Sequence, residues 1–217
     1  MLKFTNPSFI IPLLLLLTFS SAVIAFDRNT IADTAENVTP LLNGQKAPAT
    51  SLYTADGSPV SLQAFVMQKP SIIIFYRGGW CPYCNRQLAE LKDIEHDLVD
   101  LGYQVLAISP ESPARLQEQK LATEFAVTLL SDQSLDTIRG FGVGFYVEDE
   151  TSALYKQKMN IELTTDQNSR SVLPAPAVFI LDTEGFIQFS YVNPNYRVRP
   201  SAELILSAAT ALKKTSN

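Results

Sequence analysis

The chain has 217 residues, of which 46% are hydrophobic, 10% aromatic and 18% charged. This composition excludes a disordered, collagen-like or coiled-coil protein, and the length suits one domain with a complete hydrophobic core. The 17 lysines and arginines against 22 acidic residues give a formal net charge of -5, which argues against a nucleic-acid binder. Two cysteines and one histidine are too few soft ligands for a zinc site or an iron–sulfur cluster, so we expect no metal and no cofactor.

The first 25 residues have the layout of a secretory signal peptide. A basic start at Lys3 precedes an apolar stretch over residues 9–19, and small residues end the segment at Ala25. The apolar stretch is short for a membrane span and contains Pro12. We therefore expect residues 1–25 to be removed, leaving an exported, periplasmic or secreted protein with no stable membrane anchor.

Residues 26–44 are polar and lack a sustained period, so we interpret them as a linker or N-terminal extension before a single domain over residues 45–217. The strongest strand signal is residues 71–76, a continuous β-branched and aromatic run typical of a strand buried on both faces of a partly parallel sheet. Before it, residues 49–53 predict a short strand and residues 61–65 a turn of helix.

After this strand, apolar residues recur at three- and four-residue steps and predict a helix over residues 82–101. The stripe consists of Leu88, Leu91, Ile94, Leu98 and Leu101. A strand over residues 103–108, a helix over residues 112–125 and a strand over residues 127–130 follow. This alternation of strands and helices predicts parallel crossovers.

Two short helices are predicted over residues 134–141 and 151–159. Between them, a Gly-x-Gly-x-Gly pattern occupies residues 140–144. The pattern follows a predicted helix and not a strand, which disfavours a phosphate-binding loop. Residues 144–173 carry no other motif that we can interpret.

The last part of the domain contains two apolar runs, residues 177–182 and 186–191, joined by a turn at Gly185. This arrangement predicts a β-hairpin, and residues 200–212 predict a closing amphipathic helix. The whole pattern indicates an α/β fold with a central mixed sheet flanked by helices on both faces. Because there is no heptad or long apolar edge, we expect a monomer.

Cys81 and Cys84 form a Cys-Pro-Tyr-Cys motif where the buried strand ends and the helix begins. Free N–H groups and the macrodipole at a helix start lower the pKa of the first thiol, and a thiol one turn later can attack a mixed disulfide. The pair therefore predicts a catalytic switch between dithiol and disulfide. A passive disulfide is the alternative, although so small a loop is stabilised by only about 2 kcal/mol.

Three residues near the motif are candidates for a role in the site. The sequence leaves two interpretations open for Trp80 and for Arg77, and gives one for His96. Trp80 fits either a core residue or an aromatic shield and docking surface beside a thiolate. Arg77 fits either a cation that stabilises a thiolate or orients a substrate oxygen, or a solvated arginine at a strand end. His96 lies off the apolar stripe of its helix, so we expect it to face solvent.

Residues 75–84, Phe-Tyr-Arg-Gly-Gly-Trp-Cys-Pro-Tyr-Cys, resemble the active-site segment of the thioredoxin superfamily. Residues 108–112, 129–132 and 179–185 resemble matching segments of the peroxiredoxins, the alkyl hydroperoxide reductase and thiol-specific antioxidant branch. The likeness covers residues 45–191. It implies a thioredoxin-like fold, an oxidoreductase of redox or antioxidant defence, a hydroperoxide or protein disulfide as substrate and a thioredoxin-like electron donor.

The peroxiredoxin motif Pro-x-x-x-Thr-x-x-Cys is matched only in part. Its cysteine falls on Cys84, its threonine on Cys81 and its proline on Arg77, while the position of the activating arginine falls on Pro176. A proline just before a strand resembles instead the thioredoxin proline that is cis and lies against the dithiol. We predict that Pro176 is cis and, with Trp80 and Arg77, positions the substrate.

Three functions remain open at this point. In a thiol–disulfide oxidoreductase, Cys81 attacks the substrate and Cys84 resolves the mixed disulfide. In a thioredoxin-dependent thiol peroxidase, a hydroperoxide oxidises Cys84 to a sulfenic acid and Cys81 resolves it. In a redox-inert interaction domain the disulfide is permanent, which a reduction potential well below about -300 mV would indicate.

Overall fold

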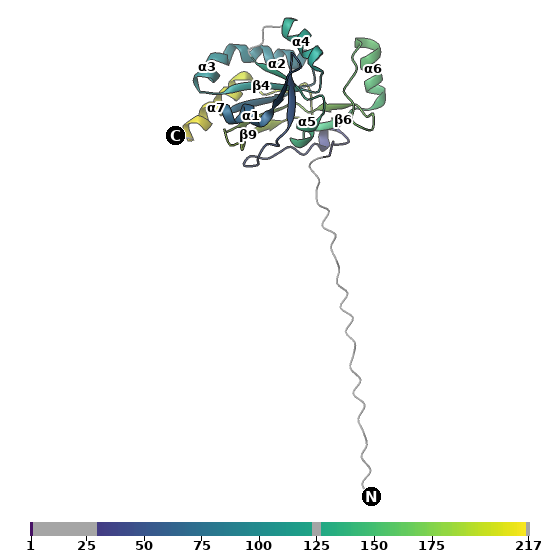
Figure 1. Cartoon of the computed structure of the whole chain (residues 1–217), viewed down its shortest axis with the longest axis horizontal. Helices are drawn as coiled ribbons and strands as arrows, with labels where there is room; N and C mark the ends of the chain where they lie inside the picture. The colour runs from purple at the N-terminus through teal and green to yellow at the C-terminus, as the bar shows by residue number, and fades with distance from the viewer. Residues whose placement is uncertain (2–29, 123–126, 216–217) are drawn as a thin grey trace.

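The computed structural model describes Met1, residues 30–122 and residues 127–215 (Figure 1). The predicted signal peptide, apart from Met1, lies outside the described residues. Within the described part of the chain, no helix is long and apolar enough to cross a membrane. In chain order the elements are η1 (Ala35–Asn37), β1 (Ser51–Thr54), β2 (Pro59–Ser61), α1 (Leu62–Gln68), β3 (Ser71–Phe75), α2 (Pro82–Glu90), η2 (Leu91–Ile94), α3 (Glu95–Asp100), β4 (Gln104–Ser109), α4 (Pro113–Ala122), β5 (Thr128–Ser131), α5 (Asp136–Gly140), β6 (Gly144–Tyr146), α6 (Asp149–Met159), β7 (Val172–Pro174), β8 (Ala177–Leu181), β9 (Ile187–Val192) and α7 (Ala202–Thr215).

The main sheet is mixed and has the strand order β2-β1-β5-β4-β3-β8-β9. The neighbours β3, β4 and β5 run parallel, as the strand–helix alternation predicted, and β8 pairs antiparallel with β3 and β9. The predicted hairpin is confirmed, because β8 and β9 are joined by the turn that contains Gly185. A separate two-stranded sheet pairs β6 with β7.

Strand β3 lies inside the sheet and is buried along its whole length. Ile73 and Phe75 contribute to a core shared with α1 and α5, whereas Ile72 and Ile74 contribute to a second core shared with α2, α3, α4 and α7. Successive residues of a strand point to opposite faces, so this continuous apolar run fills both cores. The predicted mixed sheet with helices on both faces is therefore confirmed.

The helix predicted over residues 82–101 is broken into α2, η2 and α3. The middle piece, η2, is a 3-10 segment. Side chains three residues apart are eclipsed in that geometry, so Leu91 and Ile94 both face the core, followed by Leu98 in α3. The apolar stripe identified the buried positions correctly but could not reveal the change of helix type.

Most of the other predicted elements are confirmed to within a few residues, and α4 follows its prediction as far as residue 122, beyond which the structure is not described up to residue 127. Three short strands were not predicted: β2, β6 and β7. Each has three residues, too few for a period-2 pattern to stand out.

The glycine-spaced segment packs against the N-terminal extension. The backbone N–H of Thr39 donates to the carbonyl of Gly142, and a Cβ at Gly142 would lie 2.1 Å from the Thr39 carbonyl oxygen. Gly142 also has a φ of +67°, which side-chain-bearing residues rarely adopt. Close backbone packing thus explains this glycine, in agreement with the sequence argument against a phosphate loop.

Asp132 is buried and caps α5, because its carboxylate accepts the backbone N–H groups of Thr137 and Ile138. Burial raises the pKa of Asp132 to about 6 in spite of these hydrogen bonds. Because the pKa is higher in the folded than in the unfolded state, the protonated carboxyl favours folding. This contribution to the free energy of unfolding is present in full below about pH 4 and is lost as the pH rises to about 6.

We therefore expect the free energy of unfolding, relative to Asp132→Asn, to fall by up to about 3 kcal/mol between pH 4 and pH 6 and to be constant above pH 7. Urea unfolding of both proteins at several pH values measures this difference. A difference that does not vary with pH would contradict the assignment.

Candidate active site

The two cysteines lie at the start of α2 and form a disulfide, with their Cα atoms 5.2 Å apart. Cys81 is the N-cap residue, and Pro82 occupies the first helical position, where its missing N–H is no loss. The backbone N–H of Cys84 donates to Cys81 Sγ at 3.3 Å. Both cysteines are buried, so their sulfur chemistry is governed by the few groups in direct contact.

The guanidinium of Arg199 lies against the cysteine pair. Its Nη2 atom is 3.1 Å from Cys84 Sγ and 3.9 Å from Cys81 Sγ, and its Nη1 atom donates to Gln87 Oε1 at 3.4 Å. Burial, together with the nearby charge of Arg77, lowers the pKa of Arg199 to about 10, so the side chain remains cationic at neutral pH. A cation in contact with Cys84 Sγ stabilises the thiolate of that residue in the reduced protein.

Sequence reasoning missed Arg199, which lies between β9 and α7 and 115 residues after Cys84. No motif links a loop arginine to a cysteine so far away in the chain. The available signal was the Arg-x-Arg pair formed with Arg197 directly before the last helix, in a chain with an excess of acidic residues.

Arg77 is 6% exposed, so the alternative of a solvated arginine at a strand end was wrong. Its guanidinium carbon lies 4.9 Å from the ring centroid of Trp80, 5.5 Å from that of Tyr155 and 4.5 Å from that of Tyr196. Its Nη2 atom also donates to the Tyr155 hydroxyl. Three aromatic rings from separate parts of the chain thus hold this cation by cation–π contacts.

Trp80 is half-buried, in partial agreement with its interpretation as a core residue, while a role as shield and docking surface beside a thiolate stays a prediction. Its ring packs against the core below α2 and stands 5.1 Å from the ring of Tyr155, centroid to centroid. It therefore covers Arg77 at the edge of the core. His96 is exposed, as predicted.

The prediction of a cis Pro176 is wrong, because the peptide bond before it is trans. The chain here runs directly from β7 into β8, with the Ala175 N–H bonded to the Val143 carbonyl and the Pro176 carbonyl accepting from the Asn193 N–H. This path needs no tight turn, so the usual trans preference holds. Both backbone groups are already paired within the protein, so neither is available to position a substrate.

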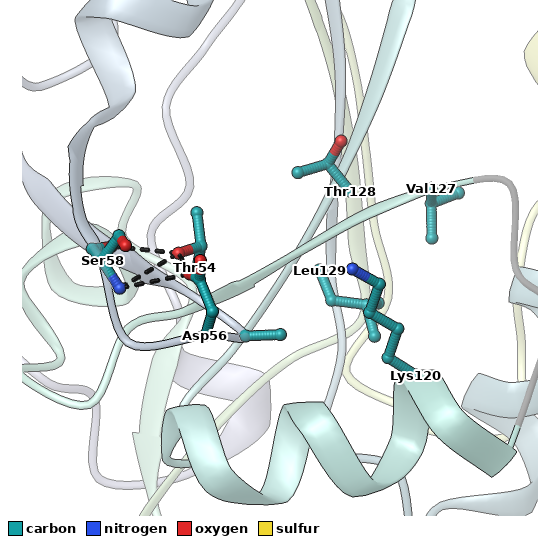
Figure 2. A pocket seen from close by; sticks show the side chains of 8 residues that line it. Thr54, Asp56, Ser58, Lys120, Val127, Thr128 and Leu129 are labelled. Carbon is teal, nitrogen blue, oxygen red and sulfur yellow. Dashed lines mark hydrogen bonds between the residues drawn. The ribbon is translucent and has the colours of Figure 1, made fainter.

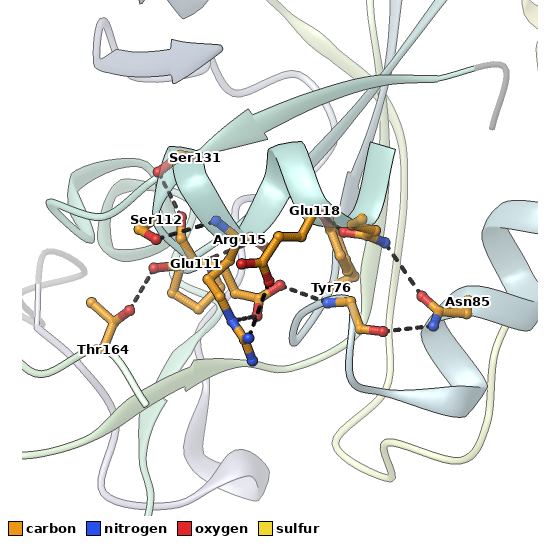
Figure 3. A network of polar contacts seen from close by, with 12 residues as sticks. Tyr76, Asn85, Glu111, Ser112, Arg115, Glu118, Ser131 and Thr164 are labelled. Atoms are coloured by element: carbon orange, nitrogen blue, oxygen red, sulfur yellow. Dashed lines mark hydrogen bonds and ion pairs between the residues drawn. The ribbon is translucent and has the colours of Figure 1, made fainter. Parts of the chain in front are cut away.

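A network of polar contacts fixes the loop before Cys81 (Figure 3). The backbone N–H of Gly79 donates to Glu111 Oε2 at 2.6 Å, and the Asn85 side chain donates to the Gly79 carbonyl at 2.6 Å. Gln119 joins Asn85 to the buried Tyr76 hydroxyl, which donates to Gln119 Oε1 at 2.9 Å. The start of α2 is thereby tied to the end of β3 and to α4.

Burial raises the pKa of Glu111, while the Gly79 N–H and the Arg115 charge oppose this shift. Glu111 and Arg115 form an ion pair at the start of α4. The carboxylate faces the loop from the side of α4, and its contacts are with a backbone amide and Arg115. It acts on the loop conformation and makes no contact with either sulfur atom.

A hollow of about 420 Å³ lies between the β1–β2 turn, α4 and β5 (Figure 2). On the side of the turn, its polar groups bond to one another: Asp56 accepts from the Thr54 hydroxyl and from the Ser58 N–H. The Thr54 contact lowers the pKa of Asp56. These groups stabilise the turn, and neither cysteine lines the hollow.

A family model described as the AhpC/TSA family matches residues 43–190 of the chain. The chain belongs to this family. This AhpC/TSA protein is 35% identical over 104 residues to peroxiredoxin Bcp of Escherichia coli K12. The aligned residues cover 48% of this chain and 66% of that protein. It is 27% identical over 150 residues to the chloroplastic peroxiredoxin Q of Oryza sativa subsp. japonica, covering 69% of this chain and 58% of that protein. The chain thus spans less than two thirds of the length of either relative.

Solved structures of related folds agree with the architecture of this AhpC/TSA protein. Peroxidoxin BcpB of Mycobacterium tuberculosis superposes with a TM-score of 0.61 at 16% identity, covering 81% of this chain and 97% of that one. Reduced Prx3 of Vibrio vulnificus, solved in complex with H2O2, superposes with a TM-score of 0.64 at 14% identity, covering 78% and 99%. At these identities the likeness establishes the thioredoxin-like fold that the sequence resemblance implied.

Proposed function

We propose that this AhpC/TSA protein is a thiol peroxidase in which Cys84 reacts with the hydroperoxide and Cys81 resolves the oxidised sulfur. The observation that carries the proposal is the contact of 3.1 Å between Arg199 Nη2 and Cys84 Sγ. The guanidinium stabilises the Cys84 thiolate and offers further N–H donors to a peroxide oxygen. These are tasks for an activating arginine, whose expected position in the sequence is occupied by Pro176. The named peroxiredoxins among its relatives support the same reaction class.

The reaction balances with the two cysteines and one external reductant. The Cys84 thiolate attacks the terminal oxygen of ROOH, the O–O bond breaks, and the products are a Cys84 sulfenic acid and, after protonation, the alcohol ROH. The Cys81 thiolate then attacks Cys84 Sγ, the S–O bond breaks, and the disulfide forms as hydroxide leaves and takes a proton from solvent to become water. A dithiol reductant of the thioredoxin type then reduces the Cys81–Cys84 disulfide by thiol–disulfide exchange. Both thiols are restored, and the reductant is left as a disulfide.

The test is the consumption of H2O2 by the reduced protein, compared with Cys84→Ser and Cys81→Ser. We expect Cys84→Ser to react no faster than a free thiol, because the activated sulfur is gone. Cys81→Ser should still react once at a rate near that of the parent and stop at a sulfenic acid, which dimedone labels and mass spectrometry detects. Rapid consumption by Cys84→Ser, or a parent rate no faster than a free thiol, would reject the peroxidase.

A second candidate is thiol–disulfide exchange led by Cys81. The observation in its favour is the position of Cys81 at the N-cap of α2, where its sulfur accepts the Cys84 N–H. Alkylation of the reduced protein at slightly acidic pH separates the two candidates. First labelling of Cys84 supports the peroxidase, and first labelling of Cys81 supports exchange.

We also propose that the protein is exported and that residues 1–25 are its signal peptide. The support is the basic, apolar and small-residue layout of that segment. Expression of the full chain followed by fractionation and N-terminal sequencing tests this. A product that begins at Phe26 in the exported fraction is expected, and an uncleaved cytosolic product would contradict the proposal.

A further inference from the structure

Two buried side-chain nitrogens in the described part of the chain have no hydrogen-bond partner, and both belong to the candidate active site. They are the Nε atoms of Arg77 and Arg199. Arg77 is more than nine-tenths buried, so its guanidinium has little access to bulk water. Buried polar groups in folded proteins are nearly always paired, and exceptions concentrate at functional sites. Arg199 contacts the disulfide directly, and Arg77 packs against Trp80, the residue before Cys81.

The charge around these two side chains is unbalanced. Among the described residues, neither arginine takes part in an ion pair, although other arginines of the chain do. Arg77 lies close enough to Arg199 for its charge to lower the pKa of Arg199. Arg197 adds a third cation, 5.4 Å from the Tyr196 ring whose centroid is 4.5 Å from Arg77. Buried cations without counter-ions are costly, yet this chain has an excess of acidic residues that could have supplied one.

The aromatic rings fix Arg77 without using up its charge. Trp80, Tyr155 and Tyr196 contact the guanidinium through their ring systems, and one hydroxyl, that of Tyr155, accepts a hydrogen bond. Each of the three aromatic residues is partly exposed, so they form the boundary between Arg77 and solvent. The cation is thus held rigidly, with its Nε–H still free, at the edge of the core.

We propose that Arg77, together with Arg199, binds a carboxylate group carried by the substrate next to Cys84. A planar guanidinium with a free Nε–H matches a carboxylate in a two-point geometry, which a neutral group cannot replace. Arg199 connects the two parts of the site, because its Nη2 atom contacts Cys84 Sγ and the ring of Tyr196, close before it in the chain, has its centroid 4.5 Å from the Arg77 guanidinium carbon. The inference rests on the proposed peroxidase and names its substrate class: organic hydroperoxides with a carboxylate on the same small molecule.

The first test measures carboxylate binding without any chemistry. Trp80 is the single tryptophan of the chain and lies beside Arg77, so its fluorescence reports on that cation. The oxidised full-length protein is titrated with acetate, with acetamide as the neutral analogue and chloride at equal ionic strength. We expect a saturable change with acetate alone. Arg77→Gln should abolish it, whereas Arg86→Gln, which removes an exposed arginine of α2, should leave it unchanged.

The second test compares two substrates that differ in one charge: 4-(2-hydroperoxypropan-2-yl)benzoate and its methyl ester. We expect the parent protein to favour the carboxylate by about tenfold or more in kcat/KM. The preference should fall to about one in Arg77→Gln and persist in Arg86→Gln. The ratio compares two substrates within each variant, so a general loss of activity does not move it.

The outcomes separate this inference from the proposed function. Equal rates for the two hydroperoxides, with no saturable response to acetate, overturn the carboxylate site while leaving the peroxidase intact. A second outcome is saturable acetate binding that is lost in Arg77→Gln, while neither hydroperoxide is consumed faster than by a free thiol. This result supports the anion site and rejects the peroxidase. A change in fluorescence that chloride reproduces at equal ionic strength shows non-specific screening and overturns the inference.

Discussion

Replacing Arg199 by methionine should lower kcat/KM for H2O2 by about 100-fold or more. The substitution removes the guanidinium that lies 3.1 Å from Cys84 Sγ, so the thiolate loses its cationic neighbour and the peroxide loses a charged donor. The pKa of the Cys84 thiol should rise in parallel. Stopped-flow kinetics with H2O2 measure the first effect, and the pH dependence of alkylation measures the second.

The stability of Arg199→Met should not fall together with its activity. Arg199 is partly buried beside another cation and has no ion-pair partner among the described residues, so methionine should leave the free energy of unfolding unchanged or raise it by about 1 kcal/mol. Arg86→Met, an exposed position on α2, is the matched control and should retain full activity. If Arg199→Met keeps the parent rate, Arg199 has no part in the reaction.

Gly78→Ala should destabilise the protein by about 2–4 kcal/mol. Gly78 has a φ of +147°, and a Cβ there would lie 2.5 Å from Trp80 Nε1 and 2.7 Å from the carboxyl carbon of Glu111. Both neighbours are held in place, Trp80 by ring contacts and Glu111 by the Gly79 N–H. The loop before Cys81 must therefore shift, which urea unfolding and Trp80 fluorescence detect.

Gly57→Ala separates backbone strain from the steric clash. Gly57 has a φ of +85°, but a Cβ at this position would meet no atom within 4 Å, so the cost there should be about 1 kcal/mol. Equal costs at the two positions would mean that the contacts with Trp80 and Glu111 are unimportant. A larger cost at Gly78, together with slower alkylation or oxidation of the cysteines, would show that the loop positions the reactive sulfur.

Much of the fold could be predicted because its signals are local. The apolar run of β3 has to be buried on both faces, the β8–β9 hairpin has its turn at Gly185, and Cys81-Pro82 has the form of a helix start. In each case neighbouring residues determine the structure. The parallel run of β3, β4 and β5 could also be predicted from the alternation of strands and helices, whereas the pairing of β1 with β5 and of β3 with β8 joins distant segments and could not.

The missing parts of the site depend on contacts between distant segments. Arg199 reaches Cys84 because the segment between β9 and α7 lies against the start of α2, and no period or spacing in the sequence encodes that contact. The cage around Arg77 brings together Trp80, Tyr155 and Tyr196 from three separate segments. The trans state of Pro176 depends on the hydrogen bonds of β7 and β8, which is why a resemblance at one position misled the prediction.

Helix α6 contributes no buried residue to either core and lies at one end of the molecule in Figure 1. Its connection to the active site is Tyr155, through the hydroxyl and ring contacts with Arg77. Selection for the active site should therefore act on this helix mainly at Tyr155, while its fully exposed positions are free to drift. Among relatives of this chain, position 155 should co-vary with position 77, and lineages that have lost the arginine should also have lost the tyrosine.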